Sequence, residues 1–267
     1  MWRRLYYLLS PAWRLAARWL RYLPYDLLHP PPPMVPPRRL MYTGRGDFVR
    51  QGEDWLRFFQ DQGLQTHHYF LDVGSGIGRI ARPLTQFLSG PYEGFDVVEM
   101  GVRWCQRHIT SRYPQFHFRH VRLHNDLYTA DGLAADRFKF PYDAATFDFG
   151  CAISVFTHLL PAETRQYLHE TARVMKPGGR FVATFFLLTG KESEVRGSFS
   201  FPHNFGHYGL MDLNVQRANV AYSPEFLEEA CRAAGWRVRL AVPGSWRGIP
   251  PSHPVAFQDV WVLEKEK

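Results

Sequence analysis

Three glycines at alternate positions, Gly74, Gly76 and Gly78, follow a short apolar run that ends in Asp72. A backbone turn of this composition lets a ligand approach closely and directs the N-terminus of the following helix at it. The next β-type run, "YEGFD", ends in a second carboxylate, Asp96. A carboxylate at that place accepts two hydrogen bonds from a ribose 2′,3′-diol and repels a 2′-phosphate. The two motifs together predict a site for a molecule that contains adenosine.

The glycine spacing separates two classes of adenosine-containing ligand only weakly. Dinucleotide-binding folds are expected to read G-x-G-x-x-G, whereas this chain reads G-x-G-x-G. The sequence "RVMKPGGRFVATFF" (residues 173–186) adds a further motif, in which a predicted helix ends at Lys-Pro-Gly-Gly and a strand follows directly. Together with "LDVGSGIGR", "YEGFD" and "FDFGCAISVFTHL", this unit closely resembles the class I S-adenosylmethionine-dependent methyltransferases. The resemblance covers roughly residues 40–265, and the leading "MYTGRGDF" is similar to a bacterial-type subgroup that acts on small molecules or lipids.

The resemblance implies which residues hold S-adenosylmethionine. The first motif, which wraps the methionine part of the cofactor, corresponds to Asp72, Gly74, Ser75, Gly76 and Gly78. The ribose position corresponds to Asp96 and Val97, and the loop "RLHNDLY" offers Asn125 or Asp126 to the adenine. The residues that line the methyl donor correspond to Ser154 and Val155, after the fourth strand. The Lys-Pro-Gly-Gly turn is expected to end a helix rather than to contact substrate.

Helical patterns alternate with short β-type runs from about residue 50 onward. Such alternation predicts a mostly parallel sheet with helices on both faces. The last two runs, "WRVRLAV" and "FQDVWVL", are joined by a short connection, which favours an antiparallel final hairpin. We therefore expect an α/β fold built on a seven-stranded Rossmann-like methyltransferase sheet, with the ligand at the carboxyl ends of the strands.

A segment of 34 residues, 189–222, separates the fifth strand from the next helix, where a short connection would suffice. Long loops of this kind are usually functional. We expect a lid over the methyl acceptor, lined by aromatic side chains (Phe199, Phe201, Phe205 and Tyr208), with a structural cover for the sheet edge as the alternative. The candidates for the base that a hydroxyl nucleophile needs are His207, His203 and Tyr208. His158, in "SVFTHL", is expected to be packed rather than catalytic.

Basic charge is concentrated in residues 1–40, which hold seven arginines against one acid, Asp26. Residues 1–28 carry an apolar and a basic helical face, residues 29–40 are a Pro-rich linker expected to act as an extended spacer, and residues 41–267 form the methyltransferase domain. No uncharged run reaches the ~20 residues that cross a bilayer. Three interpretations of the helix stay open: an interfacial helix on anionic lipid, a helix packed on its own domain or a second subunit, and an organellar presequence. We expect a cytoplasmic protein that attaches peripherally to the inner face of a membrane, with organellar import as the alternative.

The rest of the composition excludes several classes of function. The chain is 45% hydrophobic, which is enough for a substantial core. Its three cysteines are far apart and form neither a disulfide framework nor a metal-binding pair, so we expect a reducing compartment and no metal. Outside residues 1–40 the charge is nearly neutral, and the motifs that grip a flipped base are absent, which argues against a nucleic-acid substrate. We expect methylation of oxygen on a small or amphiphilic acceptor. A catalytically silent cofactor-binding scaffold is the alternative, and the oligomeric state stays open.

Overall fold

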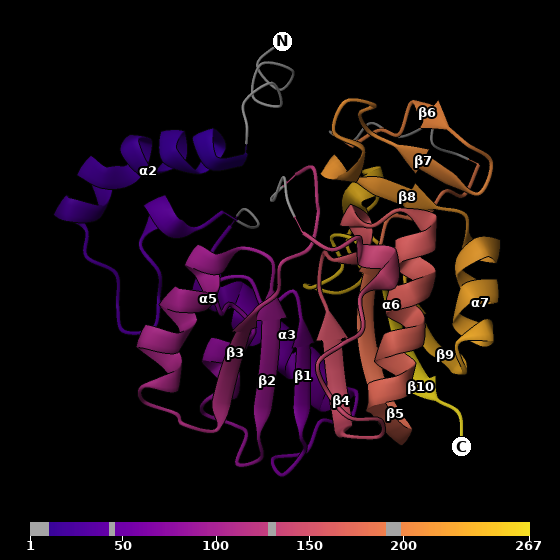
Figure 1. Ribbon diagram of the computed structural model, residues 1–267, viewed down its shortest axis with the longest axis horizontal. Coiled ribbons are helices and arrows are strands. Elements are labelled where there is room, and N and C mark those ends of the chain that lie inside the picture. Colours follow the sequence, from indigo (N-terminus) through magenta and orange to yellow (C-terminus); the bar gives the residue numbers. More distant parts are fainter. Residues whose placement is uncertain (1–10, 43–45, 128–131, 191–198) are drawn as a thin grey trace.

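The computed structural model describes the chain except for residues 1–10, 43–45, 128–131 and 191–198, and its centre is a seven-stranded sheet (Figure 1). The strands lie in the order β3-β2-β1-β4-β5-β10-β9. Their bounds are β1 Phe70–Val73, β2 Tyr92–Asp96, β3 Phe116–His120, β4 Phe147–Ala152, β5 Met175–Phe185, β9 Trp236–Val242 and β10 Asp259–Lys265. Pairing is parallel from β3 to β5, whereas β10 is antiparallel to both β5 and β9. The predicted fold class, including the antiparallel end of the sheet, is confirmed.

Helices cover both faces of this sheet (Figure 1). Their bounds are α3 Phe48–Asp61, α4 Ala81–Leu84, α5 Glu99–Cys105, α6 Pro161–Val174 and α7 Pro224–Ala233. On one face, α3, α4 and α5 bury apolar side chains such as Phe59 against Phe70 and Phe149. On the other face, α6 and α7 bury Leu168 and Leu227 in a second cluster. The sheet is thus covered on both sides, as continuous apolar strands require.

The ends of the helices follow local sequence in most places. Ser223 begins α7, and its hydroxyl accepts the N–H of Phe226 at 3.2 Å, with proline in the first helical position as predicted. The Lys-Pro-Gly-Gly segment departs from prediction, because α6 ends at Val174 and the segment lies inside β5. The pairing of β4 with β5 shifts register between Phe147 and Phe149. The four residues form a bulge between the Met175–Phe147 and Arg180–Phe149 pairs, directly after the end of the helix.

Residues 11–42, here called the arm, fold back on themselves ahead of the domain. Helix α2 spans Pro11–Leu28 and is followed by a turn in which the N–H of Val35 donates to the carbonyl of Pro32 at 3.1 Å. The short helical turn η1 (Arg38–Leu40) then returns to α2, where Asp26 accepts the N–H groups of Arg38 and Arg39 at 2.8 and 3.0 Å. The extended spacer predicted from the prolines is therefore wrong, because this buried carboxylate closes the segment into a hairpin.

Two further points concern α2. The first ten residues of the helical segment predicted at 1–28 lie outside the described residues. None of the helices in the described part of the chain is long and apolar enough to cross a membrane.

The described part of the 189–222 insertion builds a small antiparallel sheet at the carboxyl end of the main sheet (Figure 1). Its strands, in the order β6-β7-β8, are β6 His203–Asn204, β7 Tyr208–Leu210 and β8 Val220–Tyr222. Backbone hydrogen bonds between Tyr222 and the residues Phe186 and Leu188 join β8 to the chain leaving β5. Short helical turns complete the described elements: η2 Gln106–Thr110, η3 Ala135–Arg137, η4 Phe156–His158, η6 Gln216–Ala218 and η7 Ser245–Arg247.

Candidate functional site

The glycine turn between β1 and α4 has no room for side chains. Gly74, Gly76 and Gly78 all have positive φ, at +74°, +57° and +80°. A Cβ on Gly74 would lie 2.5 Å from Val155 Cγ2, and one on Gly78 would lie 2.7 Å from Ile109 Cδ1. Only glycine adopts these angles at little cost. The turn therefore forms a backbone cradle at the carboxyl end of β1, as the sequence predicts.

Asp96, the last residue of β2, is tied to that cradle. Its Oδ2 accepts the N–H of Gly76 at 2.8 Å, and its Oδ1 accepts the N–H of Val98 at 2.7 Å. Burial raises the pKa of Asp96, and the hydrogen bonds from Val98 and Gly76 act against that rise. Three donors reach the carboxylate when the hydroxyl of Tyr42 is included, at 3.4 Å from Oδ1. A carboxylate offers about four lone-pair positions, so Asp96 keeps acceptor capacity for a hydroxyl of a ligand.

Ser75 supplies a second sign that a ligand belongs in this turn. The residue is 5% exposed, and its Oγ has no hydrogen-bond partner among the described residues. Buried hydroxyls in folded proteins almost always have a partner. An orphaned hydroxyl beside an acceptor carboxylate and a side-chain-free cradle fits the polar edge of an adenosine-containing cofactor. Val97, the next residue after Asp96, packs on the core cluster with its side chain half-buried.

The carboxyl ends of β4 and β5 carry a linked polar group. Ser154 has φ +59°, a strained value for a residue with a side chain, and its N–H donates to Thr184 Oγ1 at 2.7 Å. Its hydroxyl donates to Gln258 Oε1 at 3.0 Å, and Thr184 donates to the same oxygen at 2.6 Å. Three hydrogen bonds among Ser154, Thr184 and Gln258 thus hold the strained backbone of Ser154 in place. Backbone strain that is held in this way is common at functional sites. Sequence reasoning missed Gln258, which directly precedes Asp259, the first residue of β10.

Comparison with known proteins identifies this arrangement. A family model described as a methyltransferase domain matches residues 71–183, a range that includes the glycine turn, Asp96 and Ser154. Residues 71–183 are a class I S-adenosylmethionine-dependent methyltransferase domain. The enzyme's cofactor is S-adenosylmethionine, as the motifs predict.

Solved structures share the fold of the methyltransferase. A 1,6-didemethyltoxoflavin-N1-methyltransferase from Burkholderia thailandensis, with S-adenosylhomocysteine bound, has 18% identity and a TM-score of 0.52, covering 83% of this chain and 80% of that chain. A methyltransferase from Methanosarcina mazei has 16% identity and a TM-score of 0.53, covering 78% and 97%. The [4+2]-cyclase SpnF has 19% identity and a TM-score of 0.55, covering 84% of both chains. At these identities the likeness shows the fold alone, and one fold carries several reactions.

Asp72 of the methyltransferase lies beneath the turn rather than in it. Its side chain accepts the hydroxyl of Tyr92 at 2.6 Å and the thiol of Cys151 at 3.5 Å, so it bridges β2 and β4. The residue is 1% exposed. Burial raises its pKa to about 6, with a smaller contribution from the charge of Asp96. This position allows Asp72 to support the cradle through its neighbouring strands.

Two predicted adenine contacts are engaged by the protein itself. The carboxylate of Asp126 accepts the N–H groups of Gln216 and Arg217, at 2.8 and 3.2 Å. The side chain of Asn125 accepts the N–H of Leu127 at 3.0 Å and donates to the carbonyl of His158 at 3.3 Å. Both residues therefore join the loop after β3 to neighbouring segments at the carboxyl end of the sheet.

The same region holds a buried ion pair. The guanidinium of Arg217, on η6, lies 2.6 Å from the carboxylate of Glu163, on α6. His158 is buried, and its Nδ1 contacts the carbonyl of Arg217 at 2.8 Å. Burial lowers the pKa of His158, so the ring is neutral at pH 7. His158 and Glu163 thus anchor the insertion to the domain of the methyltransferase.

The residues predicted to act on the acceptor separate into two groups. Phe199 and Phe201 pack on Phe186 and, with Trp246, form a small apolar cluster at the end of β5. Tyr208 instead stacks on Phe205, with ring centroids 4.9 Å apart.

The two histidines of the insertion differ in their surroundings. His207 stacks on Phe226 of α7 at 4.9 Å, whereas His203 lies on β6, the outer strand of the small sheet. In the part of the chain that the structure describes, neither histidine has a hydrogen bond or ring contact with the glycine turn.

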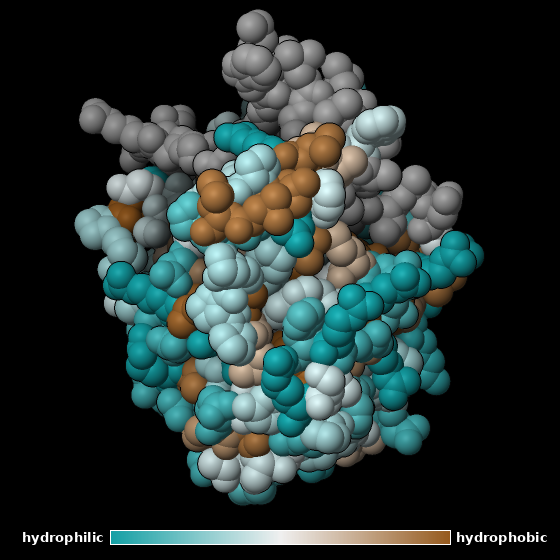
Figure 2. Space-filling view, turned by 90° about the vertical axis from the view of Figure 1, so that its left-hand side faces the viewer, coloured by the Kyte–Doolittle hydropathy of each residue, from teal (hydrophilic) through white to brown (hydrophobic). Residues whose placement is uncertain are grey.

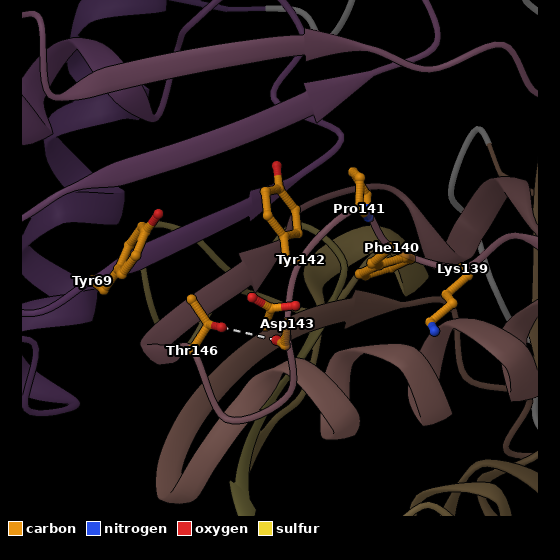
Figure 3. Close-up of a pocket in the computed structure, with 7 residues that line it drawn as sticks. All are labelled: Tyr69, Lys139, Phe140, Pro141, Tyr142, Asp143 and Thr146. Carbon is orange, nitrogen blue, oxygen red and sulfur yellow. Dashed lines mark hydrogen bonds between the residues drawn. The ribbon is translucent and has the colours of Figure 1, made fainter.

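A separate hollow of about 440 Å³ lies away from this site (Figure 3). Tyr69, which precedes β1, and Thr146, which precedes β4, line it together with Lys139, Tyr142 and Asp143. These positions place the hollow at the amino ends of the strands, opposite the cradle. The hydroxyl of Thr146 is hydrogen-bonded to the carbonyl of Asp143 at 2.8 Å, as drawn in Figure 3. The hollow and the glycine turn therefore lie at opposite ends of the sheet.

Proposed function

We propose that the methyltransferase acts on an oxygen of an amphiphilic acceptor, which it meets at a membrane surface. The observation that carries this proposal is the position of α2: this helix, which carries exposed apolar side chains, lies at the same end of the molecule as the small sheet of the insertion and the carboxyl ends of the parallel strands (Figure 1). An enzyme for a water-soluble acceptor has no need for such a helix beside its site.

The arrangement of the cofactor residues supports in-line transfer. When bound, S-adenosylmethionine supplies a methyl group activated by a positively charged sulfur. Asp96 would accept a ribose hydroxyl, Ser75 and the cradle would hold the amino-acid part, and Ser154 and Val155 would border the methyl group. The chain's part in the reaction is then to align the acceptor oxygen, because alignment supplies most of the rate in such displacements.

The apolar cluster at the end of β5 supports an amphiphilic acceptor. Phe186 is fully buried, and Phe199 and Phe201 pack on it with half-buried rings. Trp246 closes the cluster from the loop that precedes β10. Aromatic walls of this kind bind the apolar part of a ligand and exclude water from the reacting oxygen.

The general base, which would take the proton of the acceptor hydroxyl, must be chosen between the two histidines of the insertion. His207 is engaged by Phe226, so we propose His203 as the residue that takes the acceptor's proton, with Tyr208 as a neighbour on β7 that orients the acceptor. His203 belongs to the outermost strand of the insertion, where a shift of a short strand brings a side chain to a bound acceptor at small cost.

The arm supports attachment to a membrane. Trp13, Leu20, Leu27 and Leu28 are exposed on α2, and tryptophan and leucine are the side chains that enter the headgroup region of a bilayer. Arginine outnumbers acid in residues 1–40 by seven to one, which adds attraction to anionic lipid. We therefore propose a peripheral position on the inner face of a membrane.

The test is methyl transfer from labelled S-adenosylmethionine into a host extract separated into membrane and soluble fractions. We expect label in an organic-extractable species of the membrane fraction, and none with the Asp96→Ala variant. Label only in a soluble small molecule would overturn the acceptor class. No label in either fraction, with cofactor binding intact, would favour a catalytically silent scaffold instead.

A further inference from the structure

The loops that follow the strands of the main sheet all open at one end of the molecule. Strands β1 to β5 run parallel, so the segments after β3 and β5 leave the sheet at its carboxyl end. Strand β9 is antiparallel to β10, which is antiparallel to β5, so β9 runs in the same direction as β5. The loop 243–258 therefore opens at the same end, beside the insertion and the glycine cradle.

The large apolar side chains that are exposed in the described residues gather at this end. Of thirteen such side chains, six lie on α2 and five lie in loops after β3, β5 or β9. The five in loops are Leu133, Phe205, Leu213, Ile249 and Phe257. The remaining two, Val238 and Leu240, lie on the outer strand β9. Exposed apolar residues scattered singly are normal, but eleven of thirteen at one end are not scattered.

A view onto the side of the molecule that carries α2 agrees with this distribution. Figure 2 shows brown, apolar surface gathered in its upper part, over α2, above a lower part that is mostly teal. The same end is the upper end of Figure 1, where the small sheet and α2 lie.

The charge of two parts of this end, the arm and the loop 243–258, is one-sided, whereas the charges of the insertion balance. Asp26 is the only acid in residues 1–40, and it is 6% exposed and bound to Arg39 and to two backbone N–H groups. The arm's single carboxylate is thus turned inward, while Arg21 and Arg38 stay exposed. The loop 243–258 contains no acid at all. Apolar side chains on a surface with a positive excess match the interface of an anionic bilayer.

We infer that the described part of the carboxyl end of the methyltransferase is a membrane-contacting face, in which the loop 243–258 and residues 199–222 of the insertion enter the headgroup region together with α2. This inference rests on the proposed function for the class of acceptor. The mouth of the site then opens onto the bilayer, and an amphiphilic acceptor reaches the cradle without leaving lipid. The occupant of the face is an anionic lipid surface rather than a second copy of the chain.

Site-specific labelling tests the face directly. The chain's three cysteines, Cys105, Cys151 and Cys231, are all buried, and burial raises the pKa of each thiol, so an introduced exposed cysteine reacts selectively. Ile249→Cys probes the loop, and Leu240→Cys on β9 is a matched control of similar exposure, 45% against 37%. Each variant carries an environment-sensitive dye and meets vesicles of phosphatidylglycerol and phosphatidylcholine that contain nitroxide lipid.

We expect the dye at position 249 to shift to the blue and lose at least half its emission to the nitroxide, with less than a tenth lost at position 240. Vesicles of phosphatidylcholine alone should reduce bound protein about tenfold or more, because the arginines lose their attraction. Protein that floats with vesicles while position 249 stays unquenched would overturn the inference and leave α2 as the only contact. Equal quenching at both positions would overturn it as well.

A second variant distinguishes a lipid bilayer from a second copy of the chain as the partner of this face. Leu27→Glu places a carboxylate on the exposed face of α2, and we expect at least a tenfold loss of vesicle binding with unchanged mass in solution. A dimer that this variant dissociates, without vesicle binding by the parent chain, would overturn the inference. If no methyl group is transferred into the membrane fraction of the extract, the result counts against the proposed acceptor and not against the membrane-contacting face, because vesicle binding requires no methyl transfer.

Discussion

The hydroxyl of Tyr42 lies 3.4 Å from Oδ1 of Asp96, so the arm reaches the residue at the ribose position of the cofactor site. Gly101 makes this approach feasible, because a Cβ there would lie 2.3 Å from the Tyr42 hydroxyl and 2.5 Å from the carbonyl oxygen of Gly76. The arm, the start of α5 and the glycine turn therefore meet at one point. We therefore expect Tyr42 to contribute to the affinity for S-adenosylmethionine.

Replacement of Gly101 tests this junction. Gly101→Ala forces a methyl group against the backbone of the turn, which has no freedom to move, as well as against Tyr42. We expect S-adenosylhomocysteine to bind at least tenfold more weakly. Tyr42→Phe removes only a long hydrogen bond to a carboxylate, worth about 1 kcal/mol, and should weaken binding about fivefold. Calorimetric titration measures both, and a Gly101→Ala protein with wild-type affinity would contradict the junction.

Asp72 predicts a dependence of stability on pH. Burial raises its pKa from 3.8 to about 6, so the folded state holds a proton that the unfolded state has lost between these values. The contribution of Asp72 is therefore most favourable below pH 4 and is lost as the pH rises through 6. The loss amounts to about 3 kcal/mol at most. We expect Asp72→Asn, which cannot ionise, to gain in stability relative to the parent chain between pH 4 and pH 7 in urea unfolding; a constant difference would show that the carboxyl group is not buried as described.

The buried pair Arg217–Glu163 predicts how the insertion is held. Glu163→Gln removes the nearer of the two carboxylates beside the Arg217 guanidinium and leaves only Asp126, at 3.9 Å, which should cost about 1–3 kcal/mol. We expect hydrogen exchange to accelerate in residues 208–222 ahead of the rest of the chain. Glu229→Gln removes the partner of Arg165 in a pair on the surface and is the control, with exchange unchanged. Uniform acceleration throughout the domain would argue against a local anchor.

Replacement of the two histidines of the insertion should have opposite effects on kcat and on stability. His203→Ala should lower kcat by about 10²-fold or more with little change in stability, since a positioned base contributes about 10²–10⁴-fold. His207→Ala should leave kcat within about threefold and lower the melting temperature, because its ring packs on Phe226. Initial rates with saturating acceptor, together with thermal unfolding, distinguish the two. The reverse pattern would transfer the role of base to His207.

Local sequence was sufficient to predict the parts of the fold that depend on neighbouring residues. The glycine turn, the alternation of strands and helices, and the cap at Ser223 all follow from spacing and side-chain type within a few positions. The proline segment was mispredicted because a single buried side chain, Asp26, reverses it through residues more than ten positions away.

The contacts that complete the site could not be predicted from local sequence. Gln258 and Ser154 are 104 positions apart, and Tyr42 and Asp96 are 54 apart. The first pair meets because of the order of strands in the sheet and the second because the arm reaches the end of β2, not because of a local pattern. The loop residues Asn125 and Asp126 show the same limit: their types suggest a ligand, whereas tertiary packing supplies protein partners.

The most direct test of the account is the affinity of S-adenosylhomocysteine for the parent chain and for Asp96→Ala, with Glu99→Ala as the matched control. Glu99 is an exposed carboxylate at the start of α5, paired with Arg103. We predict tight binding by the parent chain, a loss of at least a hundredfold in Asp96→Ala and a change within twofold in Glu99→Ala. Unchanged affinity in Asp96→Ala would contradict the assignment of this turn as the cofactor site.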